Sequence, residues 1–271
     1  SGPPSSSIVA SLLQRMKNLP WVAEFRDLWW GNHYDHRISL IDILDKKLES
    51  KTVKNATALI TVSEPLAQEL YNRYNKPTYI IYNGFDPSEY PSSVNSEPFF
   101  TVTYTGMIYP GKRDPSFFFA AIRILSDEGL ISPEIFRVKF FGPGLHNTVF
   151  PLAEKYNVAQ FCEIHEPISR QSCLVKQCQS DLLLVLGWND AKDAGTVTGK
   201  IFEYLGAGRP ILGIGYPYGA MASILKETGM GEIINDPMQI ALFLKNCLHA
   251  WTKNNRSVRV VMRPAGVQRY T

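Results

Sequence analysis

The 271-residue chain has little of what marks several large classes of protein. Its four cysteines are too few for a disulfide framework, and Cys173 and Cys178 have no matching Cys/His pair for zinc, so we expect reduced thiols in a cytoplasmic protein. No apolar run approaches the ~20 residues of a membrane-spanning helix, and the run Leu182–Leu186 has the length of a buried strand. A net charge of +3 is too small to indicate a nucleic-acid partner.

Several sequence motifs of catalysis are also missing. There is no G-x-G-x-x-G fingerprint, P-loop, G-x-S-x-G elbow or H-E-x-x-H motif, and no D-x-D pair for Mg²⁺ follows a strand-like run. The five histidines are scattered: His33 and His36 have no acidic partner at matching spacing, and His165 falls inside a predicted strand. We therefore expect no metal site and no nicotinamide or flavin cofactor.

What the sequence does contain is an alternation of short β-branched apolar runs with helical patterns. Strands that are apolar on both faces and separated by helices predict a parallel sheet covered on both sides, so the fold class is α/β, doubly wound. The predicted strands are 21–25, 58–62, 79–82, 100–105, 137–141, 162–165, 182–186, 211–214 and 232–234. The predicted helices are 38–54, one that begins after an N-cap at Ser63, 115–128, 147–155, 170–177, 198–207, 219–228 and 237–253.

The strands are distributed unequally along the chain. Six follow residue 97, enough for a complete open sheet, whereas the part before it is too small to close a core of its own. A stretch rich in Pro, Ser and Asn at 87–98 separates the two parts and is the best linker candidate. Either the first part packs onto the second, or it is the tail of a domain whose beginning is missing. The opening Ser1-Gly2-Pro3-Pro4, without Met or a signal peptide, favours the second interpretation.

The segment from Gly195 to Leu212 has features of a phosphate site. Small residues precede a helix predicted to begin near Thr198, where free backbone N–H groups and the helix dipole suit a diphosphate. Glu203 lies one to two turns into this helix, where a carboxylate can accept two hydroxyls, as from a ribose. The alternative is an ordinary helix–strand connection with a solvated glutamate.

Candidate site residues also follow three other predicted strands. Lys112 and Arg113 come after strand 100–105, and ligands of open α/β sheets bind at this end of a strand, although a solvated basic loop would look the same. Gly142 after the next strand would let a ligand approach the backbone, or is simply part of a turn. Arg26-Asp27 after the first strand is either a site pair or a structural ion pair under an aromatic lid.

Together these segments resemble the family-four retaining glycosyltransferases of the GT-B fold, particularly bacterial members that make surface polysaccharides. The most specific match is the run Gly199–Ile211, GKIFEYLGAGRPI. Other matching segments fall in the family's order and extend the resemblance over nearly the whole chain: Pro20–Trp29, Asn83–Asp86, Tyr104–Lys112, Phe141–Gly144 and Asp181–Leu186.

The resemblance implies a particular domain organisation. Residues 1–80 would be the C-terminal part of the acceptor-binding Rossmann-like domain, and 81–98 the interdomain linker. Residues 99–254 would form the donor-binding Rossmann-like domain, and 255–271 would begin the crossover C-terminal helix. We therefore expect a fragment that lacks most of its N-terminal domain and is cut short within its last helix.

The resemblance also implies roles for individual residues. Lys112 would neutralise the donor diphosphate with help from Arg113, and Glu203 would accept the ribose hydroxyls. Arg26 stands where many members have a catalytic-site histidine, and Asp27 follows it as in the family. The other implied donor contacts are largely backbone positions, with residues 196–199 on the phosphates and 167–168 at the base: Gly106, Gly142, Pro167, Ile168, Thr196, Val197, Thr198 and Gly199.

Two positions depart from the family pattern. Many members have two glutamates eight residues apart, and the first of these falls at Gly195; many have an Arg where this chain has Met107. Sugar contacts would therefore differ, and Lys112 with Arg113 would do more of the phosphate binding. We do not interpret either difference as a loss of function.

The function implied is transfer of a sugar, with retention, from a UDP- or GDP-sugar to a glycan or lipid-linked acceptor in surface polysaccharide synthesis. No metal or other cofactor is expected, and the cytoplasm, at the inner face of the membrane, is the expected location. Lysines in the helix 38–54 could touch an acidic membrane surface, or simply form a solvated face. The alternatives are a nucleotide-sugar 2-epimerase of the same fold and a non-catalytic nucleotide-sugar-binding module.

Overall fold

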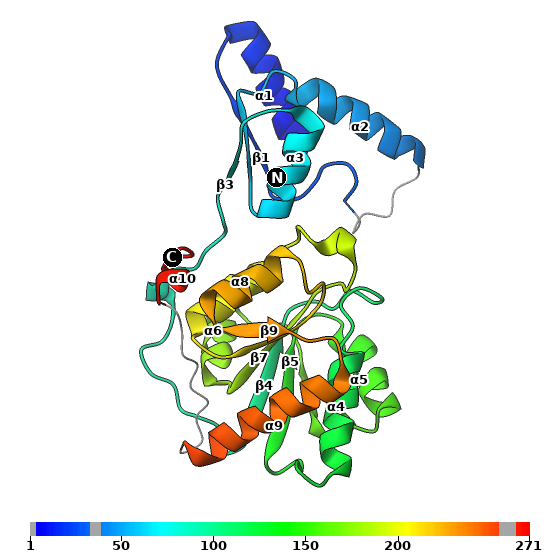
Figure 1. Ribbon diagram of the computed structural model, residues 1–271, viewed down its shortest axis with the longest axis vertical. Helices are drawn as coiled ribbons and strands as arrows, with labels where there is room; N and C mark the ends of the chain where they lie inside the picture. Colours follow the sequence, from blue (N-terminus) through cyan, green and yellow to red (C-terminus); the bar gives the residue numbers. More distant parts are fainter. Residues whose placement is uncertain (1–3, 33–38, 255–263) are drawn as a thin grey trace. The chain divides into compact units, whose positions relative to one another are not determined.

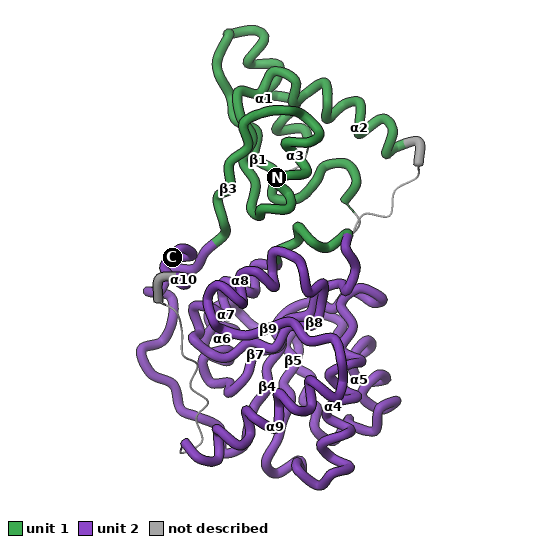
Figure 2. The backbone as a smooth tube through the Cα atoms, viewed as in Figure 1, with its two compact units in different colours: residues 1–83, 192–197 green, residues 84–191, 198–271 purple. Residues whose placement is uncertain are grey.

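The computed structural model describes residues 4–32, 39–254 and 264–271. The chain divides into two compact units, shown in Figure 2. Unit 1 contains residues 1–83 and 192–197, and unit 2 contains residues 84–191 and 198–271. His33 and His36 lie outside the described residues.

Unit 1 is built on a three-stranded parallel sheet in the order β1-β2-β3. In β1 the buried Ala23 and Phe25 alternate with exposed residues, as expected for an edge strand with one covered face. Side chains from the helices complete a small core that includes Leu59 and Leu70. The elements of this unit are α1 (Pro4–Lys17), β1 (Val22–Phe25), α2 (Ser39–Val53), β2 (Ala58–Thr61), α3 (Glu64–Tyr74) and β3 (Thr78–Ile80).

Helix α1 is not among the helices predicted from the sequence. Its apolar side chains do not form a buried stripe: Val9, Leu12, Leu13 and Met16 are all exposed, and Ser11 is the one buried residue of the helix. The amphipathic pattern that reveals a helix in a sequence is therefore missing.

Unit 2 contains a six-stranded parallel sheet in the order β6-β5-β4-β7-β8-β9 (Figure 1). The chain starts in the middle at β4, runs outward to β6, and then returns to β7 beside β4 before running to the opposite edge. This is a doubly wound sheet whose strand order reverses between β4 and β7. The strands are β4 (Phe100–Thr105), β5 (Phe136–Phe141), β6 (Cys162–His165), β7 (Leu182–Leu186), β8 (Ile211–Ile214) and β9 (Gly231–Ile233).

Helices cover both faces of this sheet, and the central strands β4 and β7 are buried along their whole length. A cluster of aromatic and aliphatic side chains between the sheet and helices α4, α5 and α9 forms the core, with Phe119 and Phe140 at its centre. The helices are α4 (Ser116–Asp127), α5 (Leu145–Lys155), α6 (Arg170–Gln179), α7 (Gly199–Ala207), α8 (Ala220–Thr228), α9 (Pro237–Lys253) and α10 (Pro264–Gln268).

The predicted fold class is confirmed, and each predicted strand is present within one or two residues. The predicted linker forms part of unit 2 from Gly84 onward and contains a short 3-10 helix, Pro87–Glu89. Of the predicted C-terminal helix, the described residues contain only α10, and residues 255–263 lie outside them. Ser63 is the N-cap of α3 as predicted, but its hydroxyl donates to the Gly195 carbonyl (2.7 Å) instead of capping the helix.

Candidate functional site

The predicted donor-site residues of unit 2 gather where its strand order reverses. Gly106 and the basic loop follow β4, Gly142 follows β5, and α7 begins after the loop that leaves β7. Ligands of doubly wound sheets bind at this point because the loops on either side of the reversal diverge and leave room between them.

Two glycines allow the ends of β4, β5 and α7 to approach closely. Gly106 has φ +117°, a conformation that side chains disfavour, and a Cβ there would lie 2.2 Å from Cε of Lys200. A Cβ on Gly142 would lie 2.3 Å from the backbone oxygen of Gly106. The Gly106 amide in turn donates to the Phe141 carbonyl at 2.7 Å. The absence of a side chain at Gly142 thus allows the backbones to pack, and its absence at Gly106 leaves the space that the end of the Lys200 side chain occupies.

This geometry makes a stability prediction for two of the predicted donor-site glycines. A Gly142→Ala methyl would press on the Gly106 backbone, which cannot swing aside, so we expect a loss of about 2–3 kcal/mol in the free energy of unfolding. A methyl group on Gly199 would meet open space within 4 Å, and Gly199→Ala is expected to change this free energy by no more than about 0.5 kcal/mol. Urea denaturation measures both, and equal losses in the two variants would contradict the packing described.

The basic loop after β4 is ordered by its own backbone and by aromatic rings. The amides of Lys112 and Arg113 both donate to the Tyr109 carbonyl, at 3.1 and 2.9 Å. The Arg113 guanidinium lies over the Tyr109 ring at 4.7 Å, and the Lys112 ammonium lies 5.2 Å from the ring of Trp188, beyond the end of β7. The two cations are therefore held at the carboxyl edge of the sheet.

Lys200 is a third cation at this edge and was not predicted from the sequence. Its ammonium lies 3.5 Å from the Tyr104 hydroxyl and 5.0 Å from the centre of that ring. Burial, with the nearby positive charge of Arg113, lowers the pKa of Lys200 to about 8, although the charge of Glu203 acts in the opposite direction. The signal in the sequence is weak because a lysine in the first turn of a helix normally points to solvent.

Glu203, the predicted ribose ligand, is held on α7 by neighbours from α6. Gln177 donates from Nε2 to Glu203 Oε2 at 3.1 Å, and Nε of Arg170 lies 3.8 Å from Oε1. The same Nε2 of Gln177 donates to the hydroxyl of Thr105 at the end of β4. The Glu203 side chain keeps 29% of its surface exposed, so its oxygens remain accessible to a ligand while their position is defined.

The segment after residue 84 also contacts α7, the helix that carries Glu203. The Tyr90 hydroxyl donates to the Glu203 carbonyl at 3.0 Å, and its ring lies against Gly206, where a Cβ would come within 2.3 Å of it. Glu89 forms a bidentate ion pair with Arg170, at 2.6 and 2.7 Å. This segment of the predicted linker therefore positions α7 and α6.

The remaining predicted donor contacts are divided between the two units. Thr198 is the N-cap of α7, with no side-chain cap bond, and belongs with Gly199 to unit 2, whereas Thr196 and Val197 belong to unit 1. Pro167 and Ile168 follow β6, whose His165 stacks on Phe141 at 4.6 Å. The roles given to these residues stay predictions.

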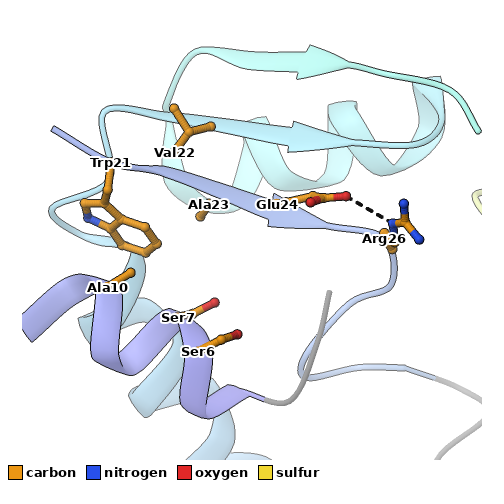
Figure 3. Close-up of a pocket in the computed structure, with 8 residues that line it drawn as sticks. All are labelled: Ser6, Ser7, Ala10, Trp21, Val22, Ala23, Glu24 and Arg26. Atoms are coloured by element: carbon orange, nitrogen blue, oxygen red, sulfur yellow. Dashed lines mark hydrogen bonds and ion pairs between the residues drawn. The ribbon is translucent and has the colours of Figure 1, made fainter.

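Arg26 and Asp27 follow β1 in unit 1. Arg26 pairs with Glu24 at 3.0 Å, and both side chains are more than half exposed, so the alternative of an Arg26–Asp27 pair under an aromatic lid does not describe Arg26. A pocket of about 520 Å³ between β1 and α1 is lined by Trp21, Glu24 and Arg26, among other residues (Figure 3).

The turn that follows Asp27 is anchored by a buried carboxylate. Glu49, fully buried on α2, accepts the Trp30 amide at 3.0 Å and the Tyr74 hydroxyl. Burial raises the pKa of Glu49. The Trp30 ring lies between the Arg73 guanidinium, at 4.1 Å, and the Lys46 ammonium, at 4.8 Å. These contacts define the shape of the chain beyond the predicted catalytic pair.

The described residues contain neither a metal-binding group nor a membrane-spanning helix. In that part of the chain no three His, Cys, Asp or Glu residues are grouped so that they could hold a metal ion. None of its helices combines the length and the apolar character needed to cross a membrane.

The chain resembles known glycosyltransferases in part of its sequence and in its fold. Residues 2–89 match the family model for Glycosyltransferase Family 4. No curated protein sequence matches the chain. Many solved structures share its fold, among them sucrose-phosphate synthase, HepE and WaaG.

Sucrose-phosphate synthase from Thermosynechococcus elongatus has a TM-score of 0.62 at 15% identity over 98% of this chain and 66% of its own. HepE from Anabaena, solved with UDP, has a TM-score of 0.68 at 12% identity over 99% of this chain and 73% of its own. WaaG, a glycosyltransferase involved in lipopolysaccharide biosynthesis, has a TM-score of 0.62 at 15% identity over 92% and 75%. The chain thus spans about two thirds to three quarters of these proteins.

The predicted resemblance is confirmed on two levels. In sequence, the match to the glycosyltransferase family model lies in the first third of the chain. In fold, nearly the whole chain has the Rossmann-like α/β architecture of GT-B glycosyltransferases.

Proposed function

We propose that this chain is part of a retaining glycosyltransferase that uses a UDP- or GDP-sugar donor. The observation that carries the proposal is the convergence of Lys112, Arg113 and Glu203 with the first turn of α7 at the reversal point of the unit 2 sheet. Two structures of HepE with the same fold were solved with UDP, one of them with glucose as well, which supports this donor class.

In the proposed reaction the bond from the sugar's anomeric carbon to the donor diphosphate oxygen breaks, a bond from that carbon to the acceptor oxygen forms, and the proton of the acceptor hydroxyl passes to the departing diphosphate. Negative charge develops on the departing nucleoside diphosphate. Lys112, Arg113 and the N-terminus of α7 would stabilise that charge, because fixed cations and backbone dipoles act without reorganising during the reaction. Glu203 would hold the ribose and so orient the donor. We propose that no metal ion or other cofactor takes part.

The remaining assignments follow the family resemblance. The backbone near Pro167 and Ile168 would meet the base, and the close approach at Gly106 and Gly142 would bring the phosphates against the backbone. Thr196 and Val197 would add backbone amides, and Arg26 and Asp27 would act at the catalytic centre on the acceptor side. Each of these residues has a role only if the donor binds as proposed.

The acceptor is proposed to be a glycan or lipid-linked sugar at the cytoplasmic face of a membrane, in surface polysaccharide synthesis. Helix α2 has exposed apolar residues, Leu44 at 65% and Ile43 at 53%, beside the exposed lysines Lys46, Lys47 and Lys51. Apolar side chains flanked by cations suit an anionic lipid surface. This composition favours membrane contact over a plain solvated face.

Vesicle sedimentation tests the membrane contact. Leu44→Asp is expected to reduce binding to vesicles containing phosphatidylglycerol about tenfold, because an apolar contact is replaced by a repelled charge. Leu242→Asp on α9, where the side chain is 59% exposed, is the matched control and should leave binding unchanged. Equal binding by wild type and Leu44→Asp would remove this part of the proposal.

Calorimetric titration with UDP, GDP and their sugar conjugates, without added metal, tests the donor class. We expect micromolar binding of one nucleotide by the wild-type chain, and at least a tenfold loss in Glu203→Ala because the ribose hydroxyls lose their acceptor. Failure of every nucleotide to bind the chain and its full-length parent alike would overturn the proposed function.

A further inference from the structure

Lys200 is half-buried and lacks the interactions that a lysine withdrawn from water normally has. An ammonium group has three hydrogens to donate, and a lysine is seldom removed from water unless it is paired. Within the described part of the chain, the Lys200 ammonium has one long hydrogen bond, 3.5 Å to the Tyr104 hydroxyl. That hydroxyl already donates to the Met107 carbonyl at 2.7 Å, so it can offer Lys200 only a lone pair.

The surroundings of Lys200 supply little compensating negative charge. The groups that face it are Tyr104 on β4, Arg113 on the loop after β4, and Glu203 on its own helix. Glu203 is engaged by Gln177 and Arg170, and Arg113 repels the ammonium. Burial and the charge of Arg113 lower the pKa of Lys200 to about 8. These two effects disfavour the ammonium form by more than the charge of Glu203 favours it.

The position of Lys200 is nevertheless specified by the fold. Its Cε and Nζ occupy the space that a side chain on residue 106 would fill, at 2.2 and 2.7 Å from the Cβ position of Gly106. Gly106 directly follows β4 and has φ +117°, and its carbonyl oxygen lies against Gly142, which directly follows β5. The lysine is therefore directed across the ends of the central strands, at the switch point of the sheet.

We propose that Lys200 is a donor-binding residue whose ammonium contacts the diphosphate of the nucleotide-sugar, together with Lys112 and Arg113. This rests on the proposed function and adds a third cation to it. The anion would supply the acceptors that Lys200 lacks, and the buried ammonium would stabilise the departing diphosphate more strongly than a solvated one, since charges interact more strongly away from water.

If Lys200 contacts the diphosphate, the protein should take up protons when the nucleotide binds. A lysine with a purely structural role would not cause this uptake. At pH 8.5 Lys200 is partly deprotonated in the free protein. An anion bound beside it would raise the pKa of its ammonium group, and the lysine would then take up a proton from the solution. The phosphates of UDP are already fully ionised at this pH and release or take up none. Titration calorimetry in buffers of different ionisation enthalpy measures the number of protons taken up.

The experiment compares wild type, Lys200→Met and Lys200→Gln in titrations with UDP, or with GDP if that is the nucleotide that binds. We expect wild type to take up about three quarters of a proton at pH 8.5, because a lysine of pKa about 8 is about three quarters deprotonated there, and both variants to bind at least tenfold more weakly with no uptake. Lys226→Met, which removes an exposed lysine of α8, is the control and should match wild type. Thermal unfolding confirms that each variant is folded.

Two results would overturn the inference in distinguishable ways. If Lys200→Met and Lys200→Gln bind the nucleotide as wild type does, with the same proton uptake, Lys200 does not contact the diphosphate and the proposed function stands. If no nucleotide binds to wild type or to the full-length parent, the proposed function fails and the inference fails with it.

Discussion

Replacing Lys112 and Arg113 together by alanine is expected to weaken nucleotide binding by about 10²- to 10⁴-fold. Charge-assisted contacts to phosphate contribute about 1.5–3 kcal/mol each, and the two residues act on the same diphosphate. Neither side chain is fully buried: Lys112 lies over the Trp188 ring and Arg113 over the Tyr109 ring, while Arg113 also interacts with the hydroxyl of the buried Tyr104 on β4. We therefore expect the free energy of unfolding to fall by no more than about 1–2 kcal/mol.

The control for this double variant removes two cations elsewhere in unit 2. Arg123 pairs with Asp127 on α4, and Lys253 ends α9. Arg123→Ala with Lys253→Ala lowers the net charge equally, so a similar loss of affinity in both double variants would indicate a general electrostatic effect instead of a local phosphate contact. Calorimetric titration and urea denaturation provide the two measurements.

Lys200→Met is expected to stabilise the ligand-free protein, an effect opposite to that of most substitutions. The pKa of Lys200 is about 8 in the folded protein and about 10.5 in an unfolded chain, so below pH 8 the folded state holds an unfavourable charge. That charge destabilises the protein by at most about 3 kcal/mol. Methionine has a similar length and no charge, and removes this penalty.

The pH dependence of this gain has a defined sign. Because the folded state binds protons less tightly than the unfolded state at Lys200, this residue makes wild-type stability rise with pH between 8 and 10.5. The advantage of Lys200→Met over wild type should therefore be largest at pH 7 and shrink toward pH 10. Urea denaturation of the two proteins side by side at each pH isolates the contribution of Lys200 from that of every other titrating group, and a difference that does not change with pH would contradict the assignment.

The central strands of unit 2 were predictable because they are buried on both faces. In β4 and β7 an uninterrupted apolar or β-branched run carries the signal, and α4 and α9 each bury one apolar face. Helix α1 was not predictable, because the residues that would show its periodicity are exposed in this chain. The alternation of strands and helices predicted a doubly wound sheet, but the order of the strands was not predicted, because no single segment specifies it.

The candidate site was predictable only in part. Lys112, Arg113 and Glu203 stand out because charged residues follow strand ends or open a helix preceded by small residues. Lys200 and Gln177 do not, because their importance comes from contacts across the sheet: Lys200 lies against Gly106, ninety-four residues earlier, and Gln177 reaches Glu203 from a neighbouring helix. Tertiary contacts of this kind have no local sequence signal.

The central claim is that the carboxyl edge of the unit 2 sheet binds a nucleoside diphosphate. A crystal structure of the protein with the nucleotide that binds in the titrations tests this most directly. We expect the diphosphate to lie within 3.5 Å of the side-chain nitrogens of Lys112 and Lys200, and the ribose hydroxyls to lie within 3.2 Å of the Glu203 carboxylate. A nucleotide bound instead in the pocket between Arg113 and Lys155, or beside Arg26 in unit 1, with Lys112, Lys200 and Glu203 untouched, would contradict it.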